Sequence, residues 1–208
     1  MPTDHYFTAQ PASDGELRSV QVRLADQDVD VVTAGGIFSP DGVDRGSVVL
    51  LKEAPAPPAE GTFLDLGCGW GPLALTLALR SPAAIVHAVD VNERALDLCR
   101  RNAGSAGCSG IRVSTPDAVD PTTTFDLIWS NPPIRVGKAV LHDLLTTWLP
   151  RLAQGPASAA YLVVQKNLGA DSLQSWLGDA LPPLMGDVAV TRVATSKGFR
   201  VLRVARRI

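Results

Sequence analysis

The tetrapeptide Asn131-Pro132-Pro133-Ile134 follows directly after an apolar run, residues 125–130, that predicts a buried strand. At the end of a strand, an asparagine side-chain oxygen and a backbone carbonyl held by proline could accept the two hydrogens of a planar –NH2 group. Asn-Pro-Pro alone is also an ordinary turn signal. Its chemical meaning therefore depends on a second segment, which lies about sixty residues upstream.

That second segment, residues 65–71, reads Asp-Leu-Gly-Cys-Gly-Trp-Gly between a predicted strand at 62–66 and a predicted helix at 72–80. Glycines in this context allow a tight turn and let the backbone approach a ligand at a helix N-terminus. Asp90 ends the next predicted strand, where its carboxylate could accept hydrogen bonds from both hydroxyls of a ribose. Together these features predict a nucleoside-cofactor site rather than a purely structural turn.

The spacing of the glycines separates two kinds of cofactor. A dinucleotide-binding loop would read Gly-x-Gly-x-x-Gly, whereas this chain has Gly-x-Gly-x-Gly with Asp65 just before it. The negative charge of Asp65 would repel a pyrophosphate but would attract a cationic amino-acid cofactor. The loop thus favours a cofactor with a positively charged part.

This acid-x-Gly-x-Gly-x-Gly loop resembles the first motif of the class I S-adenosylmethionine-dependent methyltransferases, over roughly residues 60–207. The resemblance implies a Rossmann-like α/β fold with a seven-stranded, mostly parallel sheet and an antiparallel C-terminal hairpin. It implies S-adenosylmethionine as cofactor, with Gly67 and Gly69 under the methionine part, Asp65 against that part and Asp90 on the ribose. The other positions that it assigns to the cofactor are Cys68, Gly71, Val91, Asn131 and, at the adenine ring, Asp117 and Ala118, although Asp117 also fits a plain turn.

The tetrapeptide at 131–134 resembles the [Asn/Asp/Ser]-Pro-Pro-[aromatic] motif of methyltransferases that modify nitrogen in a planar, conjugated group. By that resemblance, the Asn131 side-chain oxygen and the Pro132 carbonyl hold the amine, Pro133 fixes the backbone, and positioning supplies most of the rate acceleration. Ile134 departs from the aromatic residue that stacks on a flipped base. Phe38 or Trp70 could supply the missing ring, but for Trp70 we expect core packing.

Two flanking segments narrow the resemblance to the guanine-N2 methyltransferases of bacterial small-subunit ribosomal RNA. They are residues 36–47, which include Phe-Ser-Pro-Asp-Gly and end at Ser47, and residues 197–202, Lys-Gly-Phe-Arg-Val-Leu. The resemblance implies that Phe38 and Ser47 lie near the cofactor, and that the substrate is RNA, namely 16S rRNA or the small subunit. Residues 36–47 would also fit a surface turn and a helix start. The better-known enzymes carry a further domain in front, so this chain would recognise RNA through its N-terminal hairpin, its basic C-terminal strand or a partner.

These site residues must be positioned by alternating strands and helices, which the pattern predicts from residue 62 onward and which favour a parallel sheet. Upstream, period-two alternation at 17–24 and 29–33 predicts a β-hairpin, and a short helix is expected from Ser47. Residues 1–15 are expected to form a poorly ordered arm. A Pro-rich stretch at 54–61 predicts a boundary between an N-terminal segment, 1–60, and a methyltransferase domain, 61–208.

The bulk composition is that of an ordinary globular protein, with 46% hydrophobic and 19% charged residues in 208. Three cysteines without a Cys-x-x-Cys pair argue against disulfides and zinc, and fit a reducing cytoplasm. We expect no signal peptide and no membrane span. The net charge of −2 does not indicate a nucleic-acid-binding protein. However, six basic residues lie within the last seventeen positions: Arg192, Lys197, Arg200, Arg203, Arg206 and Arg207.

Three alternatives stay open from sequence. A protein-glutamine N5 methyltransferase uses the same Asn-Pro-Pro clamp, although its motif nearly always ends in Tyr and it normally has a helical N-terminal domain. The chain could also be an inactive cofactor-binding module of an RNA-modifying complex, against which the intact Asp65 loop and Asn131 argue. The third alternative, an NAD-dependent dehydrogenase, is disfavoured by the charge of Asp65.

Overall fold

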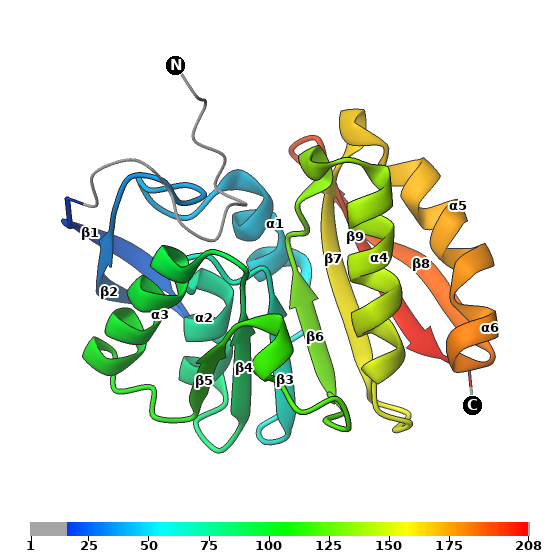
Figure 1. Ribbon diagram of the computed structural model, residues 1–208, viewed down its shortest axis with the longest axis horizontal. Coiled ribbons are helices and arrows are strands. Elements are labelled where there is room, and N and C mark those ends of the chain that lie inside the picture. Colours follow the sequence, from blue (N-terminus) through cyan, green and yellow to red (C-terminus); the bar gives the residue numbers. More distant parts are fainter. Residues whose placement is uncertain (1–15, 208) are drawn as a thin grey trace. The chain divides into compact units, whose positions relative to one another are not determined.

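The computed structural model describes residues 16–207, so the arm expected at 1–15 lies outside the described part of the chain. The chain divides into two compact units (Figure 1). The loop unit comprises Met1–Asp44 and Pro57–Pro121, and the clamp unit comprises Arg45–Ala56 and Thr122–Ile208. The division that we predicted between residues 60 and 61 does not coincide with these units, and as a statement about domains it stays a prediction.

The loop unit contains a hairpin and three parallel strands with two helices. The hairpin is β1 (Arg18–Leu24) and β2 (Gln27–Thr33), joined by a two-residue turn in which Ala25 and Asp26 both have positive φ. Its buried positions alternate along each strand, as the period-two pattern predicts. The remaining elements are β3 (Thr62–Leu66), α2 (Pro72–Arg80), β4 (Ile85–Val89), α3 (Glu93–Ser105), β5 (Ile111–Ser114) and the 3-10 turn η1 (Pro116–Ala118).

Two local rules fix the helices of this unit. Pro72 begins α2, a position where its missing N–H costs nothing because the first turn has no intrahelical acceptor. Asn92 caps α3, since its side chain accepts a hydrogen bond from the N–H of Ala95 at 3.1 Å. Both helix starts agree with the sequence-based expectation.

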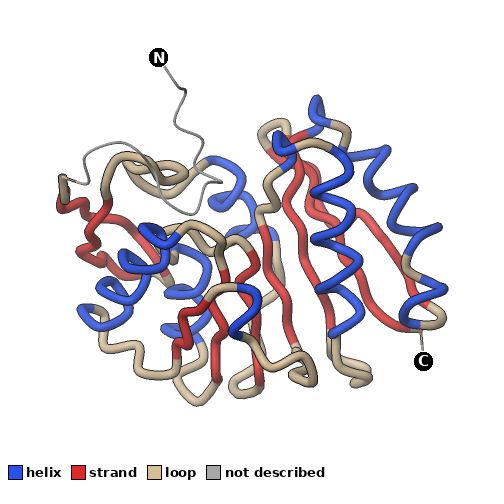
Figure 2. The backbone as a smooth tube through the Cα atoms, viewed as in Figure 1, coloured by secondary structure: helices blue, strands red, loops and turns tan. Residues whose placement is uncertain are grey.

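The clamp unit consists of four strands covered by helices. Figure 1 and the tube in Figure 2 show α4 and α5 side by side on one face of these strands, and α1 contacts β7, β8 and β9. Its elements are α1 (Arg45–Glu53), β6 (Leu127–Ser130), η2 (Ile134–Val136), α4 (Lys138–Trp148), η3 (Leu149–Arg151), β7 (Ala159–Gln165), η4 (Lys166–Leu168), α5 (Ala170–Ala180), α6 (Pro182–Met185), β8 (Val188–Ser196) and β9 (Phe199–Arg206).

Several element ends in the clamp unit differ from the sequence pattern, among them the start of α1, which lies at Arg45 and not at the expected Ser47. The strand expected from Phe125 begins at Leu127, because Phe125 pairs only through an isolated bridge to Leu152. The turn between β8 and β9 consists of only Lys197 and Gly198, both with positive φ, because β8 continues to Ser196. Such a two-residue turn matches the twist of a hairpin.

The strand order is β5-β4-β3-β6-β7-β9-β8 in a seven-stranded sheet, with β1-β2 as a separate pair. The pairs β3–β4, β4–β5 and β6–β7 are parallel, whereas β7–β9 and β8–β9 are antiparallel. This arrangement confirms the predicted fold class. No helix among residues 16–207 is long and apolar enough to cross a membrane.

Candidate functional site

The glycine loop between β3 and α2 is held by the end of β4. The carbonyl of Val89 accepts hydrogen bonds from the N–H groups of Gly67 at 2.8 Å and Cys68 at 3.0 Å. Gly67 and Gly69 have φ of 79° and 55°, and a Cβ built on either would meet no atom within 4 Å. The loop is therefore open at these two positions, as a close backbone approach by a ligand requires.

Gly71 serves a different purpose. Its φ is 99°, and a Cβ at this position would lie 2.8 Å from the Cys99 sulfur. The third glycine of the motif thus lets α2 begin close to α3. Its absent side chain is therefore explained by this packing, without reference to a ligand.

Asp90 ties the glycine loop to the start of α3. One carboxylate oxygen accepts the N–H of Gly69 at 2.9 Å, and the other accepts the N–H of Asn92 at 2.9 Å. Burial raises the pKa of Asp90, and the hydrogen bonds from Asn92, Gly69 and Val91 act in the opposite direction. A carboxylate has about four lone-pair sites, so these three backbone bonds leave acceptor capacity for a hydroxyl of a ribose.

Asp65 is fully buried at the end of β3. Its Oδ2 accepts the N–H of Ala74 in the first turn of α2 at 2.9 Å, while its Oδ1 has no hydrogen-bond partner among the described residues. Burial raises the pKa of Asp65 to about 8; the Ala74 N–H opposes that shift, and the charge of Asp90 adds to it. A buried carboxyl oxygen without a partner is costly, and a cationic group at Oδ1 would both pair it and stabilise its charged form. Asp65 therefore fits the ammonium end of an amino-acid cofactor.

The other predicted cofactor residues of this unit have varied surroundings. The Cys68 thiol is buried next to Cys99, and desolvation raises its pKa well above the ordinary value, so that it packs as a neutral group. Val91 is exposed beside Asp90. Asp117 is exposed in η1, and a hydrogen bond with the Thr115 side chain lowers its pKa. Ala118 donates its N–H to the Thr115 carbonyl at 3.2 Å.

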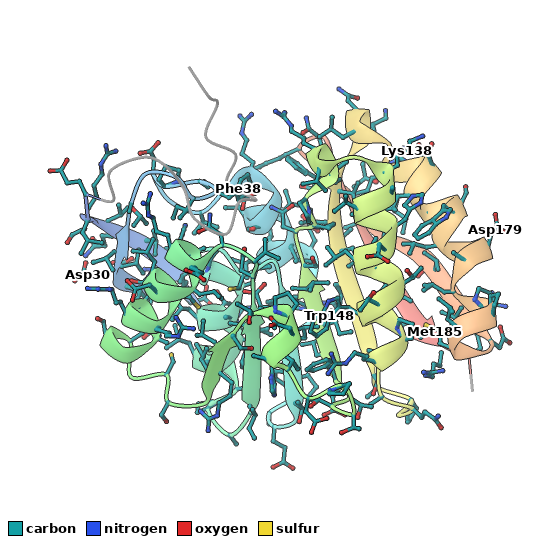
Figure 3. All side chains as sticks on the ribbon, viewed as in Figure 1. Asp30, Phe38, Lys138, Trp148, Asp179 and Met185 are labelled. Carbon is teal, nitrogen blue, oxygen red and sulfur yellow. The ribbon has the colours of Figure 1, made fainter. Side chains whose placement is uncertain are left out.

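The two candidate replacement rings are placed very differently. Trp70 is only 1% exposed and donates its indole N–H to the Ser39 carbonyl at 3.2 Å, which confirms the expectation that it packs in the core. Phe38 is 42% exposed, in the loop after β2, where Figure 3 labels it. Of the two, only Phe38 has a ring that a planar ligand could reach.

One residue that sequence reasoning missed is Asn102 on α3. Its side-chain oxygen accepts the Val32 N–H at 2.7 Å, and its amide donates to the carbonyls of Val32 and Trp70, both at 3.0 Å. It therefore replaces a strand partner for β2 and connects β2 to the glycine loop. The signal was a polar residue at helical spacing from Ala95, Leu98 and Cys99, which are all buried.

In the clamp unit, Asn131 follows directly after β6 and is paired with helix α1. Its Nδ2 donates to the Oγ of Ser47 at 3.4 Å, across 84 positions of sequence. Ser47 is 3% exposed in the first turn of α1, so water does not compete for this contact. With Nδ2 directed at Ser47, the Asn131 side-chain oxygen lies at the opposite edge of the planar amide.

The residues after Asn131 form a tight turn. Pro133 has φ −75° and ψ 78°, and the Pro132 carbonyl accepts the Ile134 N–H at 2.9 Å. These values describe an inverse γ-turn. The turn fixes the direction of the Pro132 carbonyl, whose second lone pair can accept a further hydrogen bond. Ile134 is half-buried and begins η2.

The structure thus brings the predicted residues together in two groups. In the loop unit, the N–H of Gly69 donates to the Asp90 carboxylate, and the N–H of Gly67 donates to the carbonyl of Val89, the residue before Asp90. In the clamp unit, Ser47, which we expected at the cofactor, meets Asn131. Each group follows the carboxyl end of a strand that has a parallel neighbour, which is where α/β sheets bind ligands. The cofactor and amine roles themselves remain proposals.

Comparison with known proteins identifies the family. A family model described as the methyltransferase small domain matches residues 28–203. A Bacillus subtilis protein named uncharacterized protein YbxB is 32% identical over 207 residues, which cover 98% of this chain and 99% of that protein. Ribosomal RNA small subunit methyltransferase C of Stutzerimonas stutzeri is 30% identical over 201 residues, 95% of this chain and 57% of that protein. The corresponding Aeromonas hydrophila protein is 31% identical over 167 residues, 78% of this chain and 48% of that protein.

Solved structures agree on the fold. A 16S rRNA N2 methyltransferase of T. thermophilus, in complex with AdoMet and guanosine, has a TM-score of 0.71 at 22% identity, covering 95% of this chain and 52% of that one. M. jannaschii TYW2 in complex with AdoMet has a TM-score of 0.62 at 13% identity, covering 92% and 86%.

This chain spans about half the length of the curated ribosomal RNA methyltransferases that it matches, and almost all of the Bacillus protein. The match to the family model and the identity over nearly the whole chain together decide the family and confirm the predicted class of enzyme, whose expected methyl donor is S-adenosylmethionine. The chain belongs to the methyltransferase small-domain family.

Proposed function

We propose that this protein is an S-adenosylmethionine-dependent N-methyltransferase that acts on the exocyclic N2 of a guanine in 16S ribosomal RNA. The observation that carries the proposal is the arrangement of Asn131, whose amide is oriented by Ser47 and followed by the γ-turn carbonyl of Pro132. Two fixed oxygen acceptors at a strand end suit an –NH2 group better than any other nucleophile. Neither a hydroxyl nor a carbon nucleophile has two hydrogens to donate.

The loop unit would hold the cofactor through groups that the fold has already fixed. Gly67 and Gly69 leave the backbone open to the amino-acid part, and the unpaired Oδ1 of Asp65 suits its ammonium group. Asp90 would accept a ribose hydroxyl with the acceptor capacity that its backbone hydrogen bonds do not use. Val91 and Asp117, both exposed, would border the adenosine.

The clamp unit would orient the amine. When Asn131 and Pro132 each accept one N–H, the nitrogen lone pair turns out of conjugation with the base and becomes available as a nucleophile. S-adenosylmethionine, when bound, supplies an electrophilic methyl group on a sulfonium. The amine would become acidic only once it has gained the methyl group and would then lose its proton to water, so these residues would not have to supply a strong general base. Positioning would supply most of the acceleration.

The base itself would rest on an apolar side chain. Ile134 stands where related motifs carry an aromatic ring, and it is half-buried at the start of η2. It would offer van der Waals contact to one face of an extruded guanine without π-stacking. A weaker hold on the base means that more of the substrate affinity must come from the surrounding RNA.

The choice of guanine in ribosomal RNA is supported by the names of the relatives. Two curated relatives at 30% and 31% identity are named ribosomal RNA small subunit methyltransferase C, and a structural neighbour with the same fold was solved with guanosine. Because those proteins are about twice as long, whether the target is naked RNA or an assembled subunit is part of the experiment.

The test is to incubate the protein with S-adenosylmethionine labelled in its methyl group and, separately, with naked 16S rRNA, small ribosomal subunits and release factors. We expect label on RNA, recovered after nuclease digestion as N2-methylguanosine. Label on a protein glutamine would establish the N5 alternative instead, and label on N6 of adenine would contradict the guanine assignment.

A binding measurement accompanies this assay. Titration with S-adenosylmethionine and with NAD should show heat only for the former. If the protein binds S-adenosylmethionine but labels none of the substrates, the inactive-module interpretation replaces the enzymatic one. The Asn131→Ala variant is the matched control, because it should bind the cofactor normally and lose turnover by at least about a hundredfold, the usual effect of removing a preorganised group.

A further inference from the structure

The C-terminal arginines, which the sequence singled out for RNA, are mostly engaged within the protein. Arg200 is 7% exposed and pairs with Asp171, and Arg192 lies 3.8 Å from the same carboxylate. Arg206 donates to the carbonyls of Met185 and Leu152, and Arg207 pairs with Asp187 at 3.4 Å. Four of these six basic residues therefore already have partners within the protein.

A second set of cations in the clamp unit is both exposed and unpaired. It consists of Arg135, Lys138, Lys166 and Lys197, which we call the basic rim. Within the described residues no carboxylate lies in salt-bridge range of these four side chains, and none makes a side-chain hydrogen bond. Unpaired cations on an otherwise slightly acidic protein are a feature that needs an explanation.

The rim lies at one end of the clamp unit, the end at which Asn131 leaves β6. Arg135 is in η2, four residues after Asn131, and Lys138 begins α4, which contacts η2. Lys166 follows the parallel strand β7, and its N–H donates to the Gly198 carbonyl at 2.8 Å, which places the turn residue Lys197 beside it. In Figure 3, Lys138 is at the upper end of α4, whereas Trp148 and Met185 are at the opposite end of the unit.

We infer that the basic rim binds the phosphate backbone of the RNA on either side of the nucleotide held by the clamp. This inference rests on the proposed function and adds to it the residues that recognise the polynucleotide. Phosphate contacts position a nucleic acid without reading its sequence. They would supply the positioning that a clamp with Ile134 lacks, because Ile134 cannot stack on the base as an aromatic residue does. The lysines and the arginine come from three separate segments, so together they can follow a backbone rather than grip one isolated anion.

The test measures RNA binding as a function of salt. The probe is a synthetic stem–loop RNA with unpaired guanines in the loop, bound to the full chain with S-adenosylhomocysteine present. Two rim variants, Arg135→Gln/Lys138→Gln and Lys166→Gln/Lys197→Gln, each remove two charges. The matched control, Arg203→Gln/Arg207→Gln, removes two charges from β9 and the residue after it, and Arg207 lies at the far end of that strand.

Each phosphate contact adds about 0.7 to the slope of log affinity against log salt for single-stranded RNA. Each rim pair should therefore lower the slope by about 1.4, so that raising salt from about 50 to 200 mM costs the wild type roughly sevenfold more affinity than it costs the variant. The control pair should leave the slope unchanged. Equal slopes for the rim pairs and the wild type would overturn the inference, as would a loss of slope in the control pair alone.

Two further outcomes separate this inference from the proposed function. If the wild type methylates guanine in RNA while the rim variants keep the wild-type KM and salt slope, the RNA-binding role of the rim is contradicted and the proposed function stands. If the rim variants lose salt-dependent RNA binding but the wild type methylates no RNA, the RNA-binding role of the rim stands and the proposed function is contradicted. A change in slope towards polyglutamate but not towards RNA would assign the rim to an acidic protein and contradict the RNA assignment.

Discussion

The Nδ2 of Asn131 donates to the Oγ of Ser47 at 3.4 Å, and this contact decides which atom of the Asn131 amide is presented as an acceptor. An asparagine amide is nearly symmetric in shape, so without a partner its oxygen and nitrogen could exchange places by rotation. With Ser47 as acceptor, the orientation that would bind a substrate N–H is favoured. Ser47 is thus a positioning residue for the proposed clamp.

Replacing Ser47 by Ala should lower kcat about fivefold, because one hydrogen bond of about 1 kcal/mol no longer orients the amide. The dissociation constant for S-adenosylmethionine, measured by calorimetry, should stay unchanged, and Ser47→Thr should restore part of kcat. The matched control is Ser175→Ala, the same chemical change on α5, where the exposed hydroxyl donates to the Asp171 carbonyl at 3.2 Å. Weaker cofactor binding with an unchanged kcat would instead place Ser47 at the cofactor, as the sequence alone had indicated.

The raised pKa of Asp65 predicts a pH-dependent affinity for the cofactor. Without a cation the carboxyl has a pKa of about 8 and is largely protonated at neutral pH, whereas a bound ammonium group lowers the pKa by favouring the charged form. Binding should therefore release a proton and tighten as pH rises from 6 to 8, with little further change above. Calorimetry in buffers of different ionisation enthalpy measures the proton directly.

The matched variants for this prediction are Asp65→Asn and Asp179→Asn, the second an exposed carboxylate on α5. Asp65→Asn should weaken cofactor binding by more than tenfold and abolish the proton release. Asp179→Asn should behave as the wild type. Proton release that survives in Asp65→Asn would show that another group titrates.

The same pKa has a consequence for stability. Asp65 titrates near 3.8 when unfolded and near 8 when folded, so the folded protein binds the proton more tightly. The stabilisation is fully present below pH 4 and is lost as pH rises through 8. The melting temperature of the cofactor-free protein should thus fall between pH 6 and pH 9, and in Asp65→Asn the fall should be smaller. An identical fall in both proteins would contradict the burial of an ionisable Asp65.

Asn102 offers a test of the loop unit that does not depend on catalysis. Replacing it by Ala leaves the Val32 N–H and two carbonyls, those of Val32 and Trp70, without their partner. The bond to Trp70 is buried and the two to Val32 are partly buried. An unsatisfied buried group costs about 1 to 3 kcal/mol, so we expect a loss of about 3 kcal/mol in the free energy of unfolding. Urea denaturation measures it, with exposed Asn167→Ala as the control. A loss below about 0.5 kcal/mol, the usual size for a surface change, would show that these groups find other partners.

The sequence by itself determined the local structure of both groups of site residues. The strand–loop–helix order around residues 65–71, the Pro72 helix start, the Asn92 cap and the stiff Asn131-Pro132-Pro133 turn follow from steric and hydrogen-bonding rules that act over a few residues. The family resemblance came from the same short-range patterns. For that reason the fold class, the class of enzyme and the order of the elements could be predicted before any packing was known.

Only the tertiary structure decided which of these residues are in contact and which charged side chains are paired within the protein. Ser47 and Asn131 are 84 positions apart, and Asn102 and Val32 are 70 apart, distances over which no local pattern carries information. The pKa of Asp65 depends on burial by neighbours from several elements. The C-terminal basic residues look alike in the sequence, yet most of the arginines have partners within the protein, whereas Lys197 has no ion-pair partner among the described residues. Burial and pairing are properties of the packed chain, because they depend on which distant groups exclude water from a given atom.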